Sequence, residues 1–416
     1  MKKLFAIVIS ILTALVLSAA AFAESAGFAV ESELVSSAKT PYDKKYVKIL
    51  WNTDEASTAG VPLSEGEFLY APVGNKLNKL SEKDGKLVSS VEFEEKVNEN
   101  YKGAILGKTL VQPTRTGICV VGTEQMNVLQ FKKFGEIVTD VAVLDNFAFF
   151  GVKTAENYGF YCVDLNKNLE ITAEYKTENQ PSSPALFNNF VVFSSGEKLI
   201  CFSIADKNFI ENQIGAKINY VFAGEYAIFM SGDDGFMYKL RLLGDGKTEE
   251  DSLLKCEVGG VLTAPAEADN RLYVGSTEGF FVLDGLNMEI AKKFPQMKNA
   301  CAPVITLGSG LRIYTVAPVE SDGGKWYLYG ILDSDSEQNV NEIVKIIDFT
   351  NGKITVSDNG IMFFRDNRGQ IWAITTPETD YLAIVLKILI TIAIIVFLVL
   401  IIRAWVKKHS ANKPKI

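Results

Sequence analysis

The chain has 416 residues, of which 48% are hydrophobic and 22% charged, with a formal net charge of −8 at pH 7. All 50 acidic residues lie between Glu24 and Asp380, and the same segment holds only 34 of the 42 basic residues, so its net charge is −16. Such an acidic surface repels nucleic acid and anionic lipid headgroups. We therefore expect no nucleic-acid partner.

The first 23 residues have the order of a secretory signal peptide. A short basic start precedes an apolar stretch over residues 4–17, and small residues ending in Ala21-Phe22-Ala23 follow. We predict a signal peptide over residues 1–23 that is cleaved before Glu24. The alternative is an uncleaved N-terminal anchor, which the Ala-x-Ala ending disfavours. No cysteine occurs before Cys119, so no thiol stands at the cleavage site to carry a lipid anchor.

After a lead-in over residues 24–45, a unit of short strands recurs about every 35 to 50 residues across residues 46–377. Its clearest copy is Leu262–Gly285, which joins three short strands through polar and glycine-containing turns. The predicted second strands are Glu67–Ala71, Ile118–Gly122, Phe147–Gly151, Phe190–Ser194, Tyr226–Met230, Leu272–Gly275, Arg312–Val316 and Ile361–Phe364. The predicted third strands are Lys76–Leu80, Asn127–Phe131, Phe160–Asp164, Leu199–Ser203, Phe236–Leu240, Phe280–Asp284, Trp326–Gly330 and Gln370–Ile374. The pattern predicts eight blades, each packed between two others.

The fourth strands indicate how the array closes. They are weaker, as in Leu87–Phe93 and Ile343–Asp348, and the eighth repeat stops at Pro377 without one. The segment Tyr46–Trp51 precedes the first repeat and has fourth-strand character. We therefore predict an all-β fold, an eight-bladed β-propeller in which this N-terminal strand completes the last blade and removes the open edges. An open superhelical solenoid is the alternative.

The C-terminal part reads as a membrane anchor. After a linker over residues 378–381, residues 382–402 contain a single charge, Lys387, and a helix of this length spans a hydrocarbon core of about 30 Å. Residues 403–416 contain five basic residues and no acidic one, which is typical of a cytoplasmic tail. We predict a single-pass protein of the cell membrane with one C-terminal transmembrane helix and its propeller outside the cytoplasm.

The residues that carry catalysis or bind metals are scarce. The only histidine, His409, lies in the tail, so no Ser-His-Asp or Cys-His arrangement can form outside. The five cysteines are Cys119, Cys162, Cys201, Cys256 and Cys301, and their apolar neighbours indicate core residues. Acidic runs occur at Glu94-Glu95, Asp233-Asp234-Gly235, Glu249-Glu250-Asp251 and Asp333–Glu337. We interpret them as solvated loops, with weak calcium binding at Asp233-Asp234 or Asp333–Glu337 as an alternative, and predict no catalytic, cofactor or metal site.

The phrases Ser183-Pro-Ala-Leu, Ala264-Pro-Ala and Ala302-Pro-Val, each followed by a turn and an apolar strand, resemble the pyrroloquinoline-quinone-type propeller repeat. Leu50-Trp51 resembles the aliphatic-Trp ending of that repeat. The resemblance covers residues 57–377 and implies an eight-bladed fold. One branch of this family consists of quinoprotein dehydrogenases, which use adjacent cysteines and calcium, and this chain has no adjacent cysteines.

The other branch consists of cofactor-free propellers that dock proteins, such as the lipoprotein of the outer-membrane barrel-assembly machinery. The resemblance favours this branch, although the anchor differs. We therefore expect a non-enzymatic protein-binding or scaffolding propeller in an envelope-associated complex, with an envelope or membrane protein as partner. The alternatives are a quinone-dependent oxidoreductase and a surface receptor for carbohydrate or another ligand. Fold alone does not decide between these functions.

Overall fold

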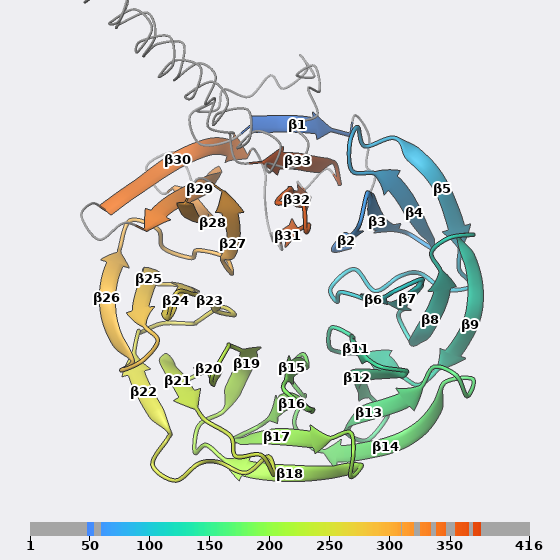
Figure 1. The fold of residues 1–416 in the computed structure, drawn as a ribbon, viewed down its shortest axis with the longest axis horizontal. Helices are drawn as coiled ribbons and strands as arrows, with labels where there is room; N and C mark the ends of the chain where they lie inside the picture. Colours follow the sequence, from blue (N-terminus) through green and yellow to red (C-terminus); the bar gives the residue numbers. More distant parts are fainter. Residues whose placement is uncertain are drawn as a thin grey trace, which may run out of the picture. The chain divides into compact units, whose positions relative to one another are not determined.

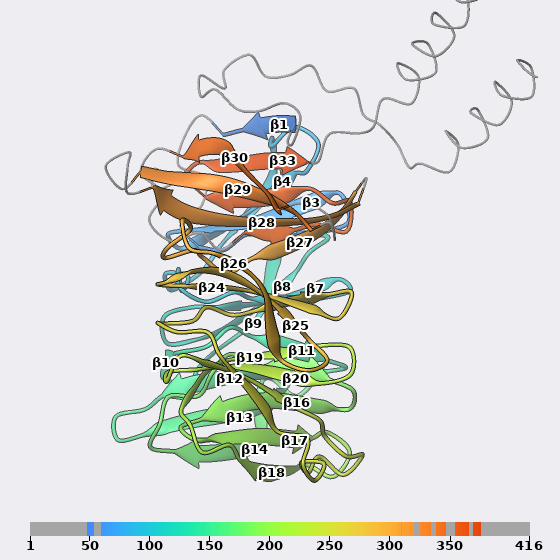
Figure 2. The same cartoon turned by 90° about the vertical axis from the view of Figure 1, so that its left-hand side faces the viewer.

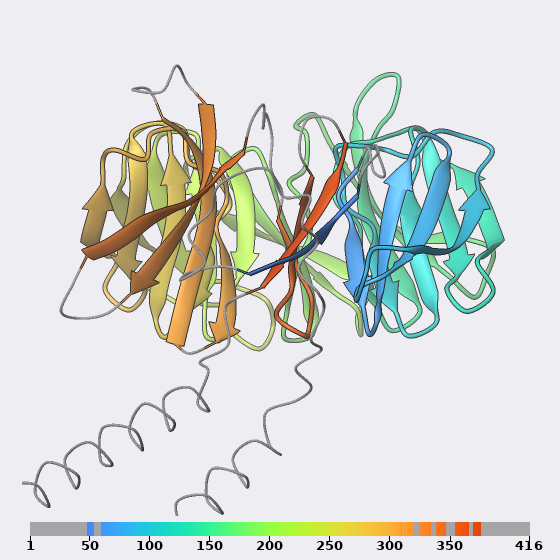
Figure 3. The same ribbon diagram turned by 90° about the horizontal axis from the view of Figure 1, so that it is seen from above.

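The computed structural model describes residues 48–53, 60–308, 310–319, 325–333, 338–346, 354–365 and 369–375. These residues form eight antiparallel sheets, which follow one another around a ring (Figure 1). In the two side views the strands of each sheet run between two faces of the ring (Figure 2, Figure 3). The predicted all-β fold, an eight-bladed β-propeller, is confirmed.

The blades are numbered in chain order, and within each the first strand lies nearest the centre of the ring. Blade 1 contains β2 (Leu63–Glu65), β3 (Phe68–Val73), β4 (Lys76–Ser81) and β5 (Leu87–Glu92), and blade 2 contains β6 (Ala104–Leu106), β7 (Thr109–Pro113), β8 (Gly117–Gly122) and β9 (Asn127–Lys133). Blade 3 contains β10 (Glu136–Ile137), β11 (Ala142–Leu144), β12 (Phe147–Lys153), β13 (Tyr158–Asp164) and β14 (Glu170–Thr177). Blade 4 contains β15 (Ala185–Phe187), β16 (Phe190–Ser195), β17 (Lys198–Ser203) and β18 (Asn208–Gln213).

The second half of the ring continues this pattern. Blade 5 contains β19 (Ile218–Ala223), β20 (Ile228–Gly232), β21 (Phe236–Leu240) and β22 (Leu254–Glu257). Blade 6 contains β23 (Ala266–Ala268), β24 (Arg271–Ser276), β25 (Gly279–Asp284) and β26 (Glu289–Phe294), and blade 7 contains β27 (Val304–Gly308), β28 (Gly310–Val319), β29 (Lys325–Asp333) and β30 (Gln338–Ile346). Blade 8 contains β31 (Thr355–Val356), β32 (Met362–Arg365), β33 (Ile371–Thr375) and, as its outer strand, β1 (Lys48–Asn52).

The core lies between the blades. Successive side chains of a strand point to opposite sides of its sheet, so each central strand must be apolar on both sides. In β12, for example, Phe149 packs in the cluster between blades 3 and 4, and Phe150 packs in the cluster between blades 2 and 3. The Phe160 and Phe193 rings stack across the blade 3–4 junction with centroids 3.7 Å apart. Such a cluster lies at each junction that the structure describes.

The strand β1 closes the ring as predicted. It pairs antiparallel with β33, so that Ile49 lies opposite Ile374. Trp51, which is 2% exposed, packs with Leu69 and Leu80 of blade 1 and joins the two ends of the array. An open solenoid would leave these surfaces exposed to solvent, so the alternative is excluded.

Blade 2 corrects one part of the strand assignment. The segment Ile118–Gly122, predicted as a second strand, lies in β8, the third strand of its blade, and Asn127–Phe131 lies in β9, the fourth. The true second strand is β7, which contains Gln112 and ends at Pro113. A polar residue and a proline hide this strand in the sequence, because proline cannot donate to a strand ladder and is rare inside sheets.

Several predicted segments lie outside the described residues: the signal peptide (1–23), the lead-in (24–45), the linker (378–381), the transmembrane helix (382–402) and the tail (403–416). Within the described ranges, no helix is long and apolar enough to cross a membrane.

Candidate functional site

The two faces of the ring differ in what they carry. Face A carries two turns of each blade, the one from the first strand to the second and the one from the third strand to the fourth. Face B carries the turn from the second strand to the third and the connections between blades. In an antiparallel sheet, successive hairpin turns alternate between the two ends of the strands. Because Lys48 lies opposite Thr375, β1 begins and β33 ends at the same face, which is face A. Both ends of the propeller therefore leave from face A.

Exposed aliphatic and aromatic side chains gather at face A. Among the described residues, fifteen large hydrophobic side chains are exposed. Thirteen of them lie in face A turns or within three residues of those turns: Leu87, Val88, Leu106, Val128, Leu129, Ile171, Leu186, Tyr226, Leu243, Leu253, Leu254, Leu286 and Ile290. At about 3.3 Å per strand residue, those that belong to strands lie within about 10 Å of this face. Single exposed apolar residues are ordinary, and their concentration at one face makes face A the candidate interaction surface.

An acidic cluster lies at the closure of the ring, also at face A. The carboxylate of Glu82, which is 3% exposed, accepts hydrogen bonds from the Ser64 hydroxyl and from the Asn359 amide at 3.3 Å. Asn359 also donates to the Gly66 carbonyl at 3.2 Å. Glu65 lies beside this pair, and its buried Oε2 has no hydrogen-bond partner among the described residues. The cluster joins blade 1 to blade 8.

The environment of this cluster disfavours negative charge. Burial raises the pKa of Glu82, the Asp358 charge raises it further, and the hydrogen bonds from Ser64, Asn359 and Ser357 only partly oppose this. Burial and Asp358 also raise the pKa of Glu65. In the described part of the chain, no three His, Cys, Asp or Glu side chains are placed to hold a metal ion. The hydrogen bonds from Asn359 hold blade 8 against blade 1 at this cluster.

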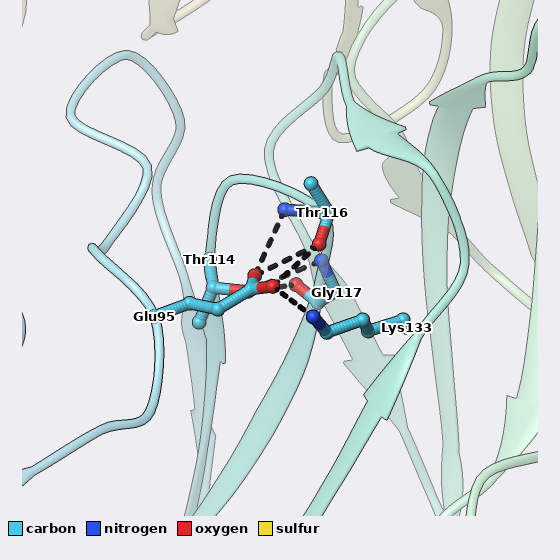
Figure 4. A network of polar contacts seen from close by, with 5 residues as sticks. All are labelled: Glu95, Thr114, Thr116, Gly117 and Lys133. Carbon is cyan, nitrogen blue, oxygen red and sulfur yellow. Dashed lines mark hydrogen bonds and ion pairs between the residues drawn. The ribbon is translucent and has the colours of Figure 1, made fainter.

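A second polar network lies at face B in blade 2 (Figure 4). Glu95 accepts from the Thr116 hydroxyl at 2.8 and 2.9 Å and from the Thr114 hydroxyl at 3.2 Å, and it pairs with Lys133 at 2.8 Å. Burial acts to raise the pKa of Glu95, but these bonds outweigh it and lower the pKa. A carboxylate that is held ionised and fully paired is a poor general base. The network fixes the β7–β8 turn against the connection that precedes blade 2.

The other acidic runs that the structure describes in full lie in separate turns and connections. Asp234 accepts hydrogen bonds from the Phe236 amide and the Tyr238 hydroxyl, and Asp233 lies 3.8 Å from Lys217, so both carboxylates have protein partners. Glu94 is exposed beside Glu95. The run Asp333–Glu337 continues beyond β29 into residues outside the described ranges.

Cys119, Cys162, Cys201 and Cys256 are free thiols. Cys119, Cys162 and Cys201 are buried, as predicted for core residues, whereas Cys256 and Cys301 are half-buried. Burial raises the pKa of Cys119 and of Cys201 to about 12, and that of Cys162 to about 11. The thiolate is the reactive form of cysteine, so these three thiols are inert at neutral pH.

Sequence reasoning missed most of the features at face A. Ser64, Glu82 and Asn359 are far apart in the chain and meet only because the ring closes. The exposed apolar residues left a weak signal, because aliphatic pairs such as Leu87-Val88 and Val128-Leu129 directly follow polar turns. The first residues of an outer strand can face solvent. An aliphatic pair at such a position could therefore have indicated an exposed apolar surface.

No family model and no curated protein matches the chain. Its fold is similar to that in the crystal structure of BamB from Moraxella catarrhalis, with 14% identity over 70% of this chain and 88% of that one and a TM-score of 0.53. It is also similar to the computationally designed Ika8 protein, with 11% identity, 79% and 99% coverage and a TM-score of 0.60. A catalytically inactive virginiamycin B lyase from Staphylococcus aureus with quinupristin matches with 13% identity, 66% and 94% coverage and a TM-score of 0.47. The first two matches establish the fold alone. This chain is a β-propeller.

Proposed function

We propose that this protein is an extracytoplasmic protein-binding propeller, anchored in the cell membrane by residues 382–402 and acting as a scaffold in an envelope-associated complex. The observation that carries the proposal is the coincidence of two features at face A. The exposed apolar side chains gather there, and β33 ends there. The apolar surface therefore lies on the side of the propeller from which the chain continues toward its apolar segment.

The sequence supports the anchor and its orientation. Six residues separate Thr375 from Leu382, and six residues extend to about 20 Å at most. A propeller on so short a tether stays within reach of the bilayer surface. Partners within reach of this surface are membrane proteins or envelope components. The signal peptide and the basic tail support a location of the propeller outside the cytoplasm.

The protonation and pairing of the thiols and carboxylates favour binding over catalysis. The buried thiols are held protonated, Glu95 is fully paired, and the carboxylates of Asp233 and Asp234 have protein partners. The resemblance of the repeats to cofactor-free propellers that dock proteins supports the same class. The fold similarity to BamB fits a propeller scaffold. We propose that the protein is not an enzyme.

Crosslinking in intact cells tests the proposal without a guess about the partner. A photo-crosslinking amino acid at Leu186 or Tyr226, both at face A, is expected to give adducts with one or a few membrane or envelope proteins. The matched control places the same amino acid at Glu156 or Glu197, in second-to-third turns at face B, and is expected to give fewer adducts. Recovery of only self-adducts or soluble small molecules from every position would refute the proposed function.

A further inference from the structure

One connection at face A is much longer than its counterparts. The third and fourth strands of blade 5, β21 and β22, are joined by residues 241–253, a span of thirteen residues. The same connection has five residues in blades 1 and 3 and four in blades 2, 4 and 6. Insertions at loop positions cost little stability, and function concentrates in them. We call residues 241–253 the hairpin insertion.

The hairpin insertion is an ordered hairpin. Leu242 and Thr248 form an antiparallel bridge. The Leu243 amide donates to the Lys247 carbonyl at 2.8 Å, and the Glu249 amide donates to the Arg241 carbonyl at 2.9 Å. The Gly246 amide closes the tip by donating to the Leu243 carbonyl at 2.9 Å. These backbone hydrogen bonds lie within the insertion and define its hairpin shape.

A side chain of the preceding blade fixes the hairpin insertion in place. Asn212, at the end of β18 and 6% exposed, donates to the Gly246 carbonyl at 3.0 Å. The side-chain Oδ1 of Asn212 accepts hydrogen bonds from the Thr248 amide at 2.8 Å and from the Thr248 hydroxyl at 2.9 Å. Gly246 packs so closely that a Cβ there would lie 2.8 Å from the Phe190 ring. One buried amide thus holds the tip of the insertion against blade 4.

The fixed insertion carries exposed apolar side chains, and others are exposed at the start of β22 and in the β25–β26 turn of blade 6. Leu243 is 48% exposed, and Leu253 and Leu254 are also exposed where the insertion enters β22. Leu286, in the β25–β26 turn, is 63% exposed, and its carbonyl accepts from Lys239 of β21 at 2.9 Å. Because Lys239 lies opposite Leu254 in the sheet, the Leu286 turn lies alongside the start of β22.

The charges around this apolar surface are acidic on balance, although Lys239 and Lys255 of blade 5 add two basic groups. Arg241 pairs with Glu249 at 2.9 Å and Lys247 pairs with Asp245 at 3.2 Å, so both basic residues of the insertion are already neutralised. Glu250 and Asp251 are exposed, and no ion pair among the described residues engages them. By contrast, near the apolar residues of blades 1 and 2, Lys86 pairs with Asp84 and Lys108 with Glu124.

We propose that the hairpin insertion, the start of β22 and the β25–β26 turn form a docking surface for a segment of a partner protein that carries aliphatic side chains beside lysine or arginine. The inference rests on the proposed function and specifies the site and chemistry of the partner. Rigid apolar residues are suited to bury against a partner without a large ordering cost, and complementary charge selects it. A lipid surface is the disfavoured occupant, because anionic headgroups repel Glu250 and Asp251.

Site-specific photo-crosslinking of the full chain in its own membrane tests this surface. The crosslinking residue is placed at Leu243 or Leu286, and the matched control positions are Leu87 and Val128, which are exposed at face A on blades 1 and 2. The expected result is a protein adduct from the first pair, with the crosslinked peptide of net positive charge. Adducts from the control pair alone would overturn this inference and leave the proposed function standing. Lipid adducts alone from Leu243 and Leu286 would overturn it as well.

A second measurement distinguishes residues that position the hairpin insertion from residues that contact the partner. Asn212→Ala removes the bonds that fix the insertion but none of its apolar residues, and it is expected to lower the adduct yield at Leu286 several-fold. Leu243→Ser is expected to lower the same yield about tenfold, as for the loss of a central interface anchor. Val128→Ser is the control and is expected to leave the yield unchanged. Equal yields for all three variants would refute the role of the insertion, and circular dichroism verifies that each variant is folded.

Discussion

At the residue scale, Trp51 joins the first segment of the propeller to its last blade. Its indole Nε1 donates to the Glu82 carbonyl at 2.6 Å, and its ring covers Gly85 so closely that a Cβ there would lie 2.7 Å away. Phe363 of blade 8 packs against the other side with ring centroids 5.8 Å apart. The side chain thus contacts both blades of the closing junction.

Replacing Trp51 should weaken the fold strongly. Trp51→Ala removes a buried aromatic ring and is expected to lower the free energy of unfolding by about 3–5 kcal/mol. Trp51→Phe keeps most of the apolar contact but leaves the Glu82 carbonyl unpaired, at a cost of about 1–3 kcal/mol. The measurement is denaturant unfolding followed by tryptophan-independent far-ultraviolet circular dichroism. Tyr226→Ala, at a residue 69% exposed, is the control, and an equal loss there would contradict the assigned role.

Glu82 predicts how the stability of the ring depends on pH. Its pKa is raised in the folded protein, so its contribution to stability is fully present below the unfolded value near 4.5 and is lost as the pH rises through the folded pKa. We expect the melting temperature of Glu82→Gln to fall less than that of the parent protein as the pH increases from 4 to 8.

Glu95 is the matched comparison, because its contribution to stability depends on pH in the opposite direction. Its pKa is lowered, so its contribution is present above the unfolded value and is lost as the pH falls. Glu95→Gln should therefore lose stability mainly at neutral pH. Identical pH profiles for the two variants would contradict both assignments.

At the element scale, the closing strand could be predicted from the sequence and blade 2 could not. The count of seven fourth strands behind eight strand pairs located β1, because a ring must supply the missing strand from its other end. In blade 2, β8 is more apolar than β7, which contains Gln112 and Pro113, so the periodicity selected β8 and β9 as the second and third strands. Hydrophobic alternation identifies strands but does not number them within a blade.

The docking surface at the hairpin insertion could not be predicted from the sequence, because it depends on a contact between distant residues. The run Glu249-Glu250-Asp251 was interpreted as a solvated loop, and its acidic residues are indeed part of a surface connection. That this connection is rigid depends on Asn212, which precedes it by more than thirty residues and meets it only through blade packing. No local pattern encodes such a contact.

Deleting β1 tests ring closure directly. Removal of residues 46–52 leaves β33 as an exposed edge and uncovers the junction of blades 1 and 8, so the melting temperature should fall sharply. Removal of residues 24–36, which lie in the predicted lead-in, should change it little. The comparison is made by thermal unfolding of both truncated chains, and equal tolerance of the two deletions would argue against closure by this strand.

At the scale of the whole molecule, the proposed topology makes a prediction for intact cells. Protease added outside should digest the propeller and spare a small C-terminal fragment that contains residues 382–416, detected through a tag on the cytoplasmic tail. Digestion after permeabilisation, which should also remove the tag, is the control. Full protection of the chain in intact cells would show that the orientation is reversed.

The strand order of blade 8 also determines how the molecule bears mechanical load. The last strand before the proposed anchor, β33, is an interior strand with β32 on one side and β1 on the other. A pull on the chain beyond Thr375 therefore acts on two hydrogen-bonded ladders at once, along the strand direction, so that many bonds must shear together. An edge strand in the same place could be peeled away one bond at a time. A scaffold pulled from the membrane side would thus hold its tether through an interior strand, where two ladders share the load.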